Sequence, residues 1–163
     1  MGRPSSPSGQ DQGSAPPVDA LAPLRGQGPA VVAVALGGAV GAIARWAVGL
    51  ALPTPAGTFP LATFLVNVLG CFLIGVVVVA VTELTTAHPL VRPFLATGIL
   101  GGFTTFSTYS VDAQHLVAAG RIGTAFTYLG ATLAAAVVAA WLGLAAARFL
   151  GRRMRPSTPG GTG

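Results

Sequence analysis

Four apolar runs, each about as long as a bilayer is thick, constrain the fold of this chain most. They cover about residues 30–52, 61–81, 91–119 and 122–149. A helix of roughly 20 apolar residues crosses the hydrocarbon core of a membrane, and it satisfies its own backbone hydrogen bonds there. The connections are short, so neighbouring helices should be antiparallel. The sequence predicts an all-α membrane protein with four transmembrane helices and no soluble catalytic domain.

The composition agrees with a membrane location. Hydrophobic residues make up 52% of the chain and charged residues 8%, whereas soluble domains carry about 25% charged residues. The net charge of +5 comes from arginines, most of them near the ends of the apolar runs, where they can meet lipid headgroups. A basic balance placed in this way does not suggest a nucleic-acid partner. The single cysteine, Cys71, cannot form an internal disulfide and gives no information on compartment.

The two ends of the chain have a different composition. Residues 1–28 are rich in Gly, Pro, Ser and Gln, and residues 151–163 are basic and rich in Gly and Pro. Such segments cannot bury a core, so we expect a disordered N-terminal tail and a flexible basic C-terminal tail. The transmembrane domain should occupy residues 29–150. Four helices form too thin a bundle to surround an aqueous path, so we expect an oligomer.

The stretch "GGFTTFSTYS", residues 101–110, interrupts the third apolar run with two glycines and several hydroxyl residues. Glycine unwinds at little cost, and serine and threonine compete with helical hydrogen bonds. We therefore expect the third helix to be broken near its middle, with freed carbonyls lining a cavity or coordinating a cation. Phe106 and Tyr109 should share a face after the break, where their ring edges can touch an anion. Aromatic residues at this spacing are more often simply core.

The first run contains "GGAVGAIARW", in which Gly37, Gly41 and Ala44 lie near one helical face and let another helix approach closely. Arg45 lies about midway along the run. An arginine at this depth is costly unless it reaches a cavity or hydrogen-bond acceptors. We expect Arg45 to act in a site or to support one.

Polar side chains recur at helical spacing in two further runs. Thr63, Asn67 and Gly70 share one face of the second run, and Tyr128 and Thr132 share one face of the fourth. Asn67 can donate two hydrogen bonds and so replace water around an anion. It can equally join two helices. The hydroxyls can form a polar path, or each can bond a carbonyl one turn back.

Catalysis is not expected from this chain. Asp112 and His115, with Ser107 or Ser110, have the residue types of a hydrolytic triad, but they come from one helical stretch without a nucleophile elbow. His88 and His115 lack companions at metal-ligand spacing. We therefore expect neither an enzyme nor a transition-metal site.

Three segments together resemble the signatures of the Fluc (CrcB) family of fluoride channels: "GGAVGAIARW", "TFLVNVLGCFLIG" and above all "GGFTTFSTYS". The resemblance covers about residues 30–150. It implies a fluoride-specific channel that passively exports fluoride through the cell membrane and lowers its toxicity in the cytoplasm. It also implies an antiparallel dimer with two pores, and a structural sodium ion at the dimer interface held by main-chain oxygens.

The resemblance assigns roles to individual residues of this sequence. The sodium ligands would be the backbone carbonyls of Gly101 and Thr104, and Arg45 would support the site. The implied fluoride pathway consists of Asn67, Phe106, Tyr109, Thr63, Ser107, Tyr128 and Thr132.

The chain departs from the family pattern at three positions. Tyr109 stands where the family typically has phenylalanine, and its hydroxyl can narrow, reorient or hydrogen-bond that part of the pore. Ala136 lies where some members carry another hydroxyl, so the polar path can be shorter. Asp112 replaces a more usual glutamate near the pore mouth.

Two other classes of function remain as alternatives. A small multidrug-exporter-like antiporter also has four helices and an antiparallel dimer, but it needs a carboxylate inside the membrane. Here Glu83 and Asp112 lie near the ends of their runs. A membrane assembly protein that transports nothing is the second alternative.

The arginines predict how the chain is oriented. One side of the membrane would hold both termini and the second connection, and the opposite side only Arg121. By the positive-inside rule, both termini should be cytoplasmic. Insertion in one orientation would require an oppositely oriented paralogue as partner, whereas dual insertion would allow a homodimer. The arginines on the terminal side are Arg3, Arg25, Arg92, Arg148, Arg152, Arg153 and Arg155.

Overall fold

The computed structural model describes residues 27–84 and 88–154, and within these ranges it is helical without any strand. Three helical stretches are long and apolar enough to cross a membrane, namely Gly28–Ala51, Leu61–Glu83 and Ile122–Arg153. The protein is therefore an all-helical membrane protein. In chain order the elements are α1 (Gly28–Ala51), α2 (Leu61–Val79), the π-helix η2 (Ala80–Leu84), the π-helix η3 (Pro93–Leu100), α3 (Gly101–Phe103), α4 (Ser107–Ala118) and α5 (Ile122–Met154).

The first, second and fourth apolar runs match helices closely, because α1, α2 and α5 begin within about two residues of the expected positions. The third run forms η3, α3 and α4 in place of one long helix. Helix α5 also includes residues 151–154, which the sequence analysis assigned to the C-terminal tail. The remaining parts of both expected tails lie outside the described residues.

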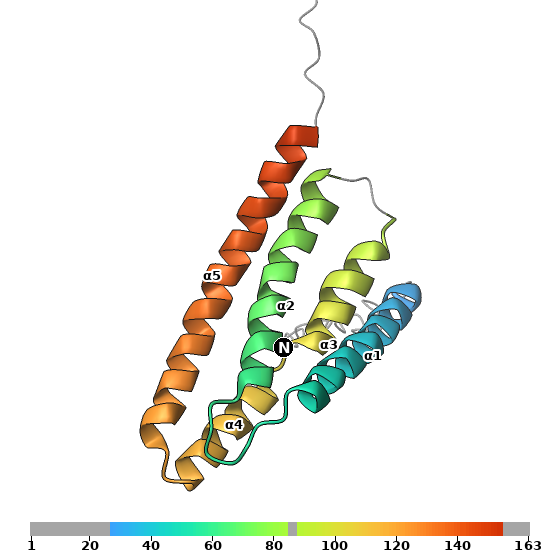
Figure 1. Cartoon of the computed structure of the whole chain (residues 1–163). Helices are drawn as coiled ribbons and strands as arrows, with labels where there is room; N and C mark the ends of the chain where they lie inside the picture. Colours follow the sequence, from blue (N-terminus) through green and yellow to red (C-terminus); the bar gives the residue numbers. More distant parts are fainter. Residues whose placement is uncertain (1–26, 85–87, 155–163) are drawn as a thin grey trace, which may run out of the picture.

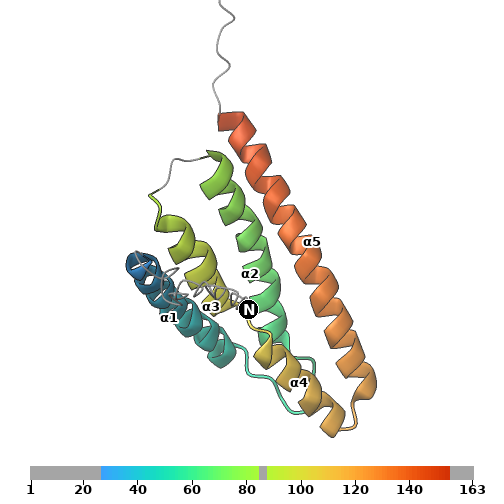
Figure 2. The same cartoon turned by 180° about the vertical axis from the view of Figure 1, so that it is seen from behind.

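The helices form two close pairs, seen from opposite sides in Figure 1 and Figure 2. Helix α1 packs along η3 and α3, and α2 packs along α5. Helix α4 turns away from α1 and packs against α5 at the end where α5 begins. The third run is therefore shared: its first half belongs to one pair and its second half to the other.

Glycines set the close approach within the first pair. A Cβ atom added to Gly37, Gly41 or Gly102 would collide with backbone atoms of the facing helix. This confirms the expected role of Gly37 and Gly41 as points of close helix contact. Ala44, which was expected on the same face, is instead exposed.

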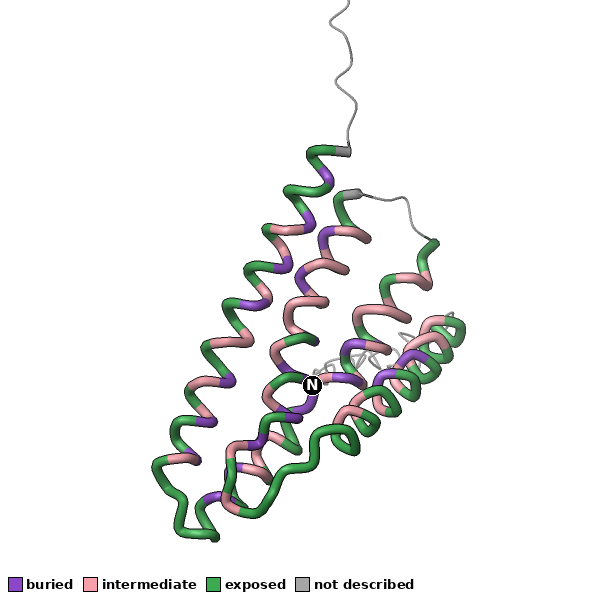
Figure 3. The backbone as a smooth tube through the Cα atoms, viewed as in Figure 1, coloured by how far each residue is buried: buried purple, intermediate pink, exposed green. Residues whose placement is uncertain are grey.

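The second pair is also closed by glycine. A Cβ on Gly75 would meet the Ala140 carbonyl, and a Cβ on Gly143 would meet the Phe72 carbonyl. Figure 3 shows that buried positions follow the inner sides of α2 and α5, whereas most of α1 is exposed. Because the exposed side chains of α1 are mainly apolar, we assign this face to lipid or to another subunit.

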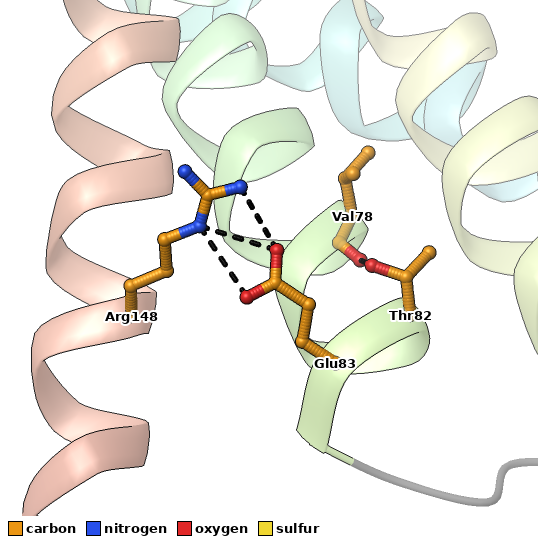
Figure 4. Close-up of polar contacts among 4 residues, drawn as sticks. All are labelled: Val78, Thr82, Glu83 and Arg148. Atoms are coloured by element: carbon orange, nitrogen blue, oxygen red, sulfur yellow. Dashed lines mark hydrogen bonds and ion pairs between the residues drawn. The ribbon is translucent and has the colours of Figure 1, made fainter.

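An ion pair joins η2, which continues α2, to the far end of α5, as Figure 4 shows. Arg148 donates from Nη2 to Glu83 Oε1 at 2.9 Å, and from Nε to both carboxylate oxygens. Both side chains are largely exposed. Nearby, the hydroxyl of Thr82 donates to the Val78 carbonyl one turn back.

Candidate functional site

The helix of residues 93–103 stops at Phe103, and the chain is helical again from Ser107. Thr104 has an extended conformation, with φ −72° and ψ 157°. The backbone therefore leaves the helix after the glycines. Gly101 and Gly102 are themselves helical, and Gly102 lies in close contact with the backbone of Gly38 of α1. The sequence singled out the glycine pair as the residues that unwind, whereas the extended residue is Thr104.

Asn67 of α2 holds the unwound segment by two hydrogen bonds to a single residue. Its Oδ1 accepts from the backbone N–H of Thr105 at 2.8 Å, and its Nδ2 donates to the Thr105 carbonyl at 3.0 Å. Both residues are buried. The amide thus satisfies backbone groups that would otherwise be unpaired, a loss that costs about 1–3 kcal/mol for each group. It still has one amide hydrogen for another acceptor.

The hydroxyl of Thr105 organises the start of α4. It accepts from the backbone N–H of Thr108 at 3.1 Å, as an N-terminal helix cap does. It also contacts the hydroxyls of Thr108 at 3.0 Å and Ser107 at 3.2 Å. Thr105 is therefore the centre of the polar network at the break.

Arg45 reaches the same segment from α1. Its Nη1 donates to the Thr104 carbonyl at 3.4 Å, and the residue is partly buried. The arginine thus finds an acceptor that the broken helix provides, which offsets part of the cost of its position in an apolar helix. The structure places Arg45 at the break.

Asp112 joins three helices below the break. Thr63 of α2 donates to its Oδ2 at 2.7 Å, and Tyr128 of α5 donates to the same oxygen at 3.3 Å. The hydroxyls of Thr63 and Tyr128 therefore bond a carboxylate, not the carbonyl one turn back. Tyr128 is fully buried.

Aromatic rings extend from the break toward this carboxylate. Phe106 and Tyr109 lie with centroids 5.7 Å apart, and Tyr109 lies 5.3 Å from Tyr128. The Tyr109 hydroxyl donates to the Leu129 carbonyl of α5 at 2.9 Å. Phe106 is 79% exposed, so its ring stands at an open surface of the described chain. The two rings share a face, as their spacing predicted.

A groove of about 350 Å³ runs beside the break. The Thr132 hydroxyl is buried and has no hydrogen-bond partner in the part of the chain that the structure describes. Four of the residues assigned to the fluoride pathway therefore share one groove with the unwound segment. Its lining consists of Asn67, Cys71, Thr104, Thr105, Phe106, Tyr109, Thr132, Leu133 and Ala136.

The other residues assigned to the fluoride pathway do not line this groove. Thr63 and Arg45 line a second hollow of about 330 Å³ between α1 and α2, which Thr105 also borders. Ser107 is exposed beside Thr105, and Tyr128 lies buried behind Tyr109. The seven residues thus follow the break and its surroundings without lining a single continuous hollow in one chain.

Thr105 and Thr108 were not singled out from the sequence, although both belong to the quoted stretch. The signal available was the threonine pair at 104 and 105 followed by a hydroxyl three positions later, a spacing typical of helix caps. Asp112 was set aside as part of an improbable triad, yet it accepts two hydrogen bonds. Among residues 27–84 and 88–154, no group of three His, Cys, Asp or Glu side chains is placed to hold a metal ion.

Known proteins share these segments. The profile described as "CrcB-like protein, Camphor Resistance (CrcB)" matches residues 32–144. A "Fluoride-specific ion channel FluC 1" of Streptomyces coelicolor is 58% identical over 124 residues, which cover 76% of this chain and 80% of that protein. A "Fluoride-specific ion channel FluC" of Acidobacterium capsulatum is 43% identical over 112 residues, covering 68% and 90%. The matched region contains most of α1, the break and most of α5, and this chain therefore belongs to the CrcB-like family.

Proposed function

We propose that this protein is a fluoride-specific ion channel that lets fluoride leave the cytoplasm passively. Relatives at 43–58% identity over most of their length carry that name. The observation in this chain that carries the proposal is the groove at the break, where neutral hydrogen-bond donors and ring edges lie together. The chain is a channel of the cell membrane on this proposal and not an enzyme.

The groove has chemistry suited to a small, strongly hydrated anion. Asn67 offers its second amide hydrogen, and the unpartnered hydroxyl of Thr132 offers another. The edges of Phe106 and Tyr109 carry partial positive charge. Such donors can replace waters around fluoride, while the groove lining contains no charged side chain that would trap the ion.

Four crossings and an antiparallel dimer complete the proposal. Residues 93–118 are long enough in total to cross a bilayer if η3, α3 and α4 act as one broken helix. The exposed Phe106 beside the unwound residues supports a second subunit at this surface, because unwound backbone is tolerated in membranes where protein or water covers it. The two pores would then lie beside two such breaks.

A structural sodium ion fits the break. The backbone N–H groups that would bond the carbonyls of Gly101 and Thr104 in a regular helix belong to Thr105 and Thr108, and both are bonded to side chains instead. Carbonyl oxygens are ligands that hard cations accept. The carbonyl oxygens of Gly101 and Thr104 would hold the ion. Its positive charge would attract these oxygens in both subunits and so stabilise the dimer.

The exporter-like alternative requires a carboxylate free to exchange protons within the membrane. Glu83 is paired with Arg148, and Asp112 accepts hydrogen bonds from Thr63 and Tyr128. Neither is an unpartnered carboxylate within a hollow. These contacts favour passive flow, and an assembly protein without transport would have no use for the donors of the groove.

Fluoride efflux from proteoliposomes tests the proposed function. Purified full-length protein, reconstituted with its oppositely oriented partner where one is required, should release fluoride and retain chloride, whereas the same amount of lipid without protein should release neither. Asn67→Leu should lower the fluoride rate strongly, since leucine keeps the bulk and removes the donors. Efflux equal to that of empty liposomes, from folded protein with any oppositely oriented partner present, would contradict the proposal.

The orientation of the chain supports a paired assembly. In the described part, Arg92, Arg148, Arg152 and Arg153 lie at the end of the bundle where α5 stops, and Arg121 at the other end. The positive-inside rule then favours cytoplasmic termini and one main orientation. Streptomyces avermitilis has relatives named FluC 2 and FluC 3, so one organism can hold more than one such chain.

We therefore propose that the working channel pairs this chain with an oppositely oriented paralogue. Reporter fusions at the C-terminus should give mainly cytoplasmic signal, and co-expression with a paralogue should raise fluoride flux. Equal signals from both sides of the membrane, together with full flux from this chain alone, would establish dual insertion and a homodimer instead.

A further inference from the structure

We propose that Asn67 and Thr105 form a clamp that keeps the carbonyl oxygens of Gly101 and Thr104 available to a monovalent cation. This inference rests on the proposed function, because it concerns the sodium site described there. It assigns positioning roles to two residues that need not touch the ion.

The first arm of the clamp acts on Gly101. In a regular α-helix the N–H of Thr105 would bond the Gly101 carbonyl, four residues earlier. That N–H instead donates to Asn67 Oδ1 at 2.8 Å. The donation from Asn67 Nδ2 to the Thr105 carbonyl at 3.0 Å fixes the amide in this orientation. Gly101 therefore loses its regular donor, and a Cβ built on it would meet nothing within 4 Å, so this position is open.

The second arm acts on Thr104. The regular donor to its carbonyl would be the N–H of Thr108, which instead bonds the Thr105 hydroxyl at 3.1 Å. The remaining donor is Arg45 Nη1 at 3.4 Å, a long contact for a hydrogen bond. A carbonyl oxygen has two lone pairs, so Thr104 retains capacity for a cation. Thr105 thus takes part in both changes. Its own N–H bonds Asn67 instead of the Gly101 carbonyl, and its hydroxyl accepts the N–H of Thr108 that would otherwise bond the Thr104 carbonyl.

Gly70 of α2 supports this arrangement from outside the clamp. It lies one turn beyond Asn67, and a Cβ there would overlap the side-chain methyl of Thr104. The missing side chain lets the extended Thr104 pack against α2. The face of α2 that carries Asn67 and Gly70 is therefore shaped to hold the break, which explains the buried position of both residues.

Thr105→Val tests the clamp, because valine has the shape of threonine and lacks the hydroxyl. The matched control is Thr105→Ser, which keeps the hydroxyl. The readout is the thermal unfolding of the purified full-length channel in detergent, together with its partner if one is required. NaCl replaces N-methyl-D-glucamine chloride in increasing proportion, so that the sodium concentration rises while the chloride concentration stays constant. An ion that binds only the folded state raises the unfolding temperature as its concentration rises.

The wild-type protein should be stabilised by sodium. Thr105→Val should need about three- to tenfold more sodium for the same stabilisation, the size expected from one lost hydrogen bond. Thr105→Ser should behave like the wild type. Unfolding that does not depend on sodium, or equal sodium dependence in the valine and serine variants, would overturn the clamp.

Hydrogen exchange of the wild-type protein provides a second test that needs no variant. The amides of Thr105 and Thr108 should both be protected, because each donates to a side chain. Exchange of either amide at the rate of an unstructured peptide would overturn the proposal. Because this test uses only the wild-type protein, it applies even if Thr105→Val does not fold.

Fluoride efflux measured on the same preparations separates this inference from the proposed function. Sodium-dependent stability without fluoride flux would reject the channel and support the clamp. Flux combined with sodium-independent stability would support the channel and reject the clamp.

Discussion

Both helix pairs approach closely at glycines, but they are held together in different ways. Helix α1 approaches η3 and α3 through glycines, and within the described residues its side-chain hydrogen bond to this run is the long contact from Arg45 to Thr104. Helix α2 approaches α5 through glycines too, yet it is also joined to α5 and α4 by polar side chains. The first pair therefore depends mainly on backbone fit, and the second has additional polar bonds.

This difference explains the place of the break. The third run must follow α1 in its first half and α5 in its second, and one straight helix cannot follow two diverging partners. The unwound residues lie where the run changes partner. Asn67 of α2, a helix of the second pair, makes hydrogen bonds to the unwound Thr105. The geometry that the proposed channel needs is thus a consequence of how the pairs are packed.

The largest effect should come from filling a glycine of the first pair. Gly41→Ala puts a Cβ against the Ile99 carbonyl and the Phe103 N–H, and overpacking of this kind costs about 1–3 kcal/mol or more. We expect a markedly lower unfolding temperature in detergent and loss of fluoride efflux. Gly49→Ala is the matched control on the same helix, because a Cβ there meets nothing within 4 Å.

The comparison becomes sharper when the second pair is changed in the same way. Gly143→Ala puts a Cβ against the Phe72 carbonyl, and Gly130→Ala is its control in open space. The polar bonds between α2, α4 and α5 should keep the pair together after a small shift. Gly143→Ala should therefore lower the unfolding temperature less than Gly41→Ala. The reverse order would show that the polar bonds add little.

Much of this arrangement could be predicted from periodicity, and the rest depends on distant contacts. The spacing of Thr63, Asn67 and Gly70 correctly placed them on one buried face, because a helix repeats its directions every 3.6 residues. The role of Thr105 could not be derived in this way. Its partner Asn67 is 38 residues away, and only the packing of α2 against the break decides which threonine of the pair turns inward.

An intermediate effect is expected from the carboxylate that belongs to the second pair. Asp112→Leu leaves the hydroxyls of Thr63 and Tyr128 without their acceptor, at a cost of about 1–3 kcal/mol for a buried unpaired group. Asp112→Asn keeps an acceptor oxygen and is the matched control. We expect lower stability and slower fluoride efflux in the leucine variant, and near-normal values in asparagine. Equal behaviour of the two would remove Asp112 from the bonds that hold α4.

A smaller effect should follow from Tyr109→Phe, which removes one hydroxyl and keeps the ring. The hydroxyl donates to the Leu129 carbonyl on α5, and a hydrogen bond of this type contributes about 0.5–1.5 kcal/mol. The ring should stay against Tyr128 but turn more freely. We expect slightly lower stability with fluoride efflux changed by less than about tenfold. Ser110→Ala, which removes a hydroxyl bonded within α4, is the control, and identical efflux in both variants would mean that the tether does not orient the ring.

The smallest effect should come from the ion pair at the far end of the second pair. Glu83→Gln removes the charge that Arg148 contacts through Nη2 and Nε, but both side chains are largely exposed, and pairs of this kind stabilise proteins little. The distance over which salt screens charges falls from about 10 Å at 0.1 M to about 3 Å at 1 M, so an exposed ion pair weakens in concentrated salt. The variant should therefore unfold at a slightly lower temperature in dilute salt and at the wild-type temperature in concentrated salt, with unchanged fluoride efflux. A large loss of stability that persists in concentrated salt would mean that this contact, and not the polar bonds near α4, gives the second pair its additional strength.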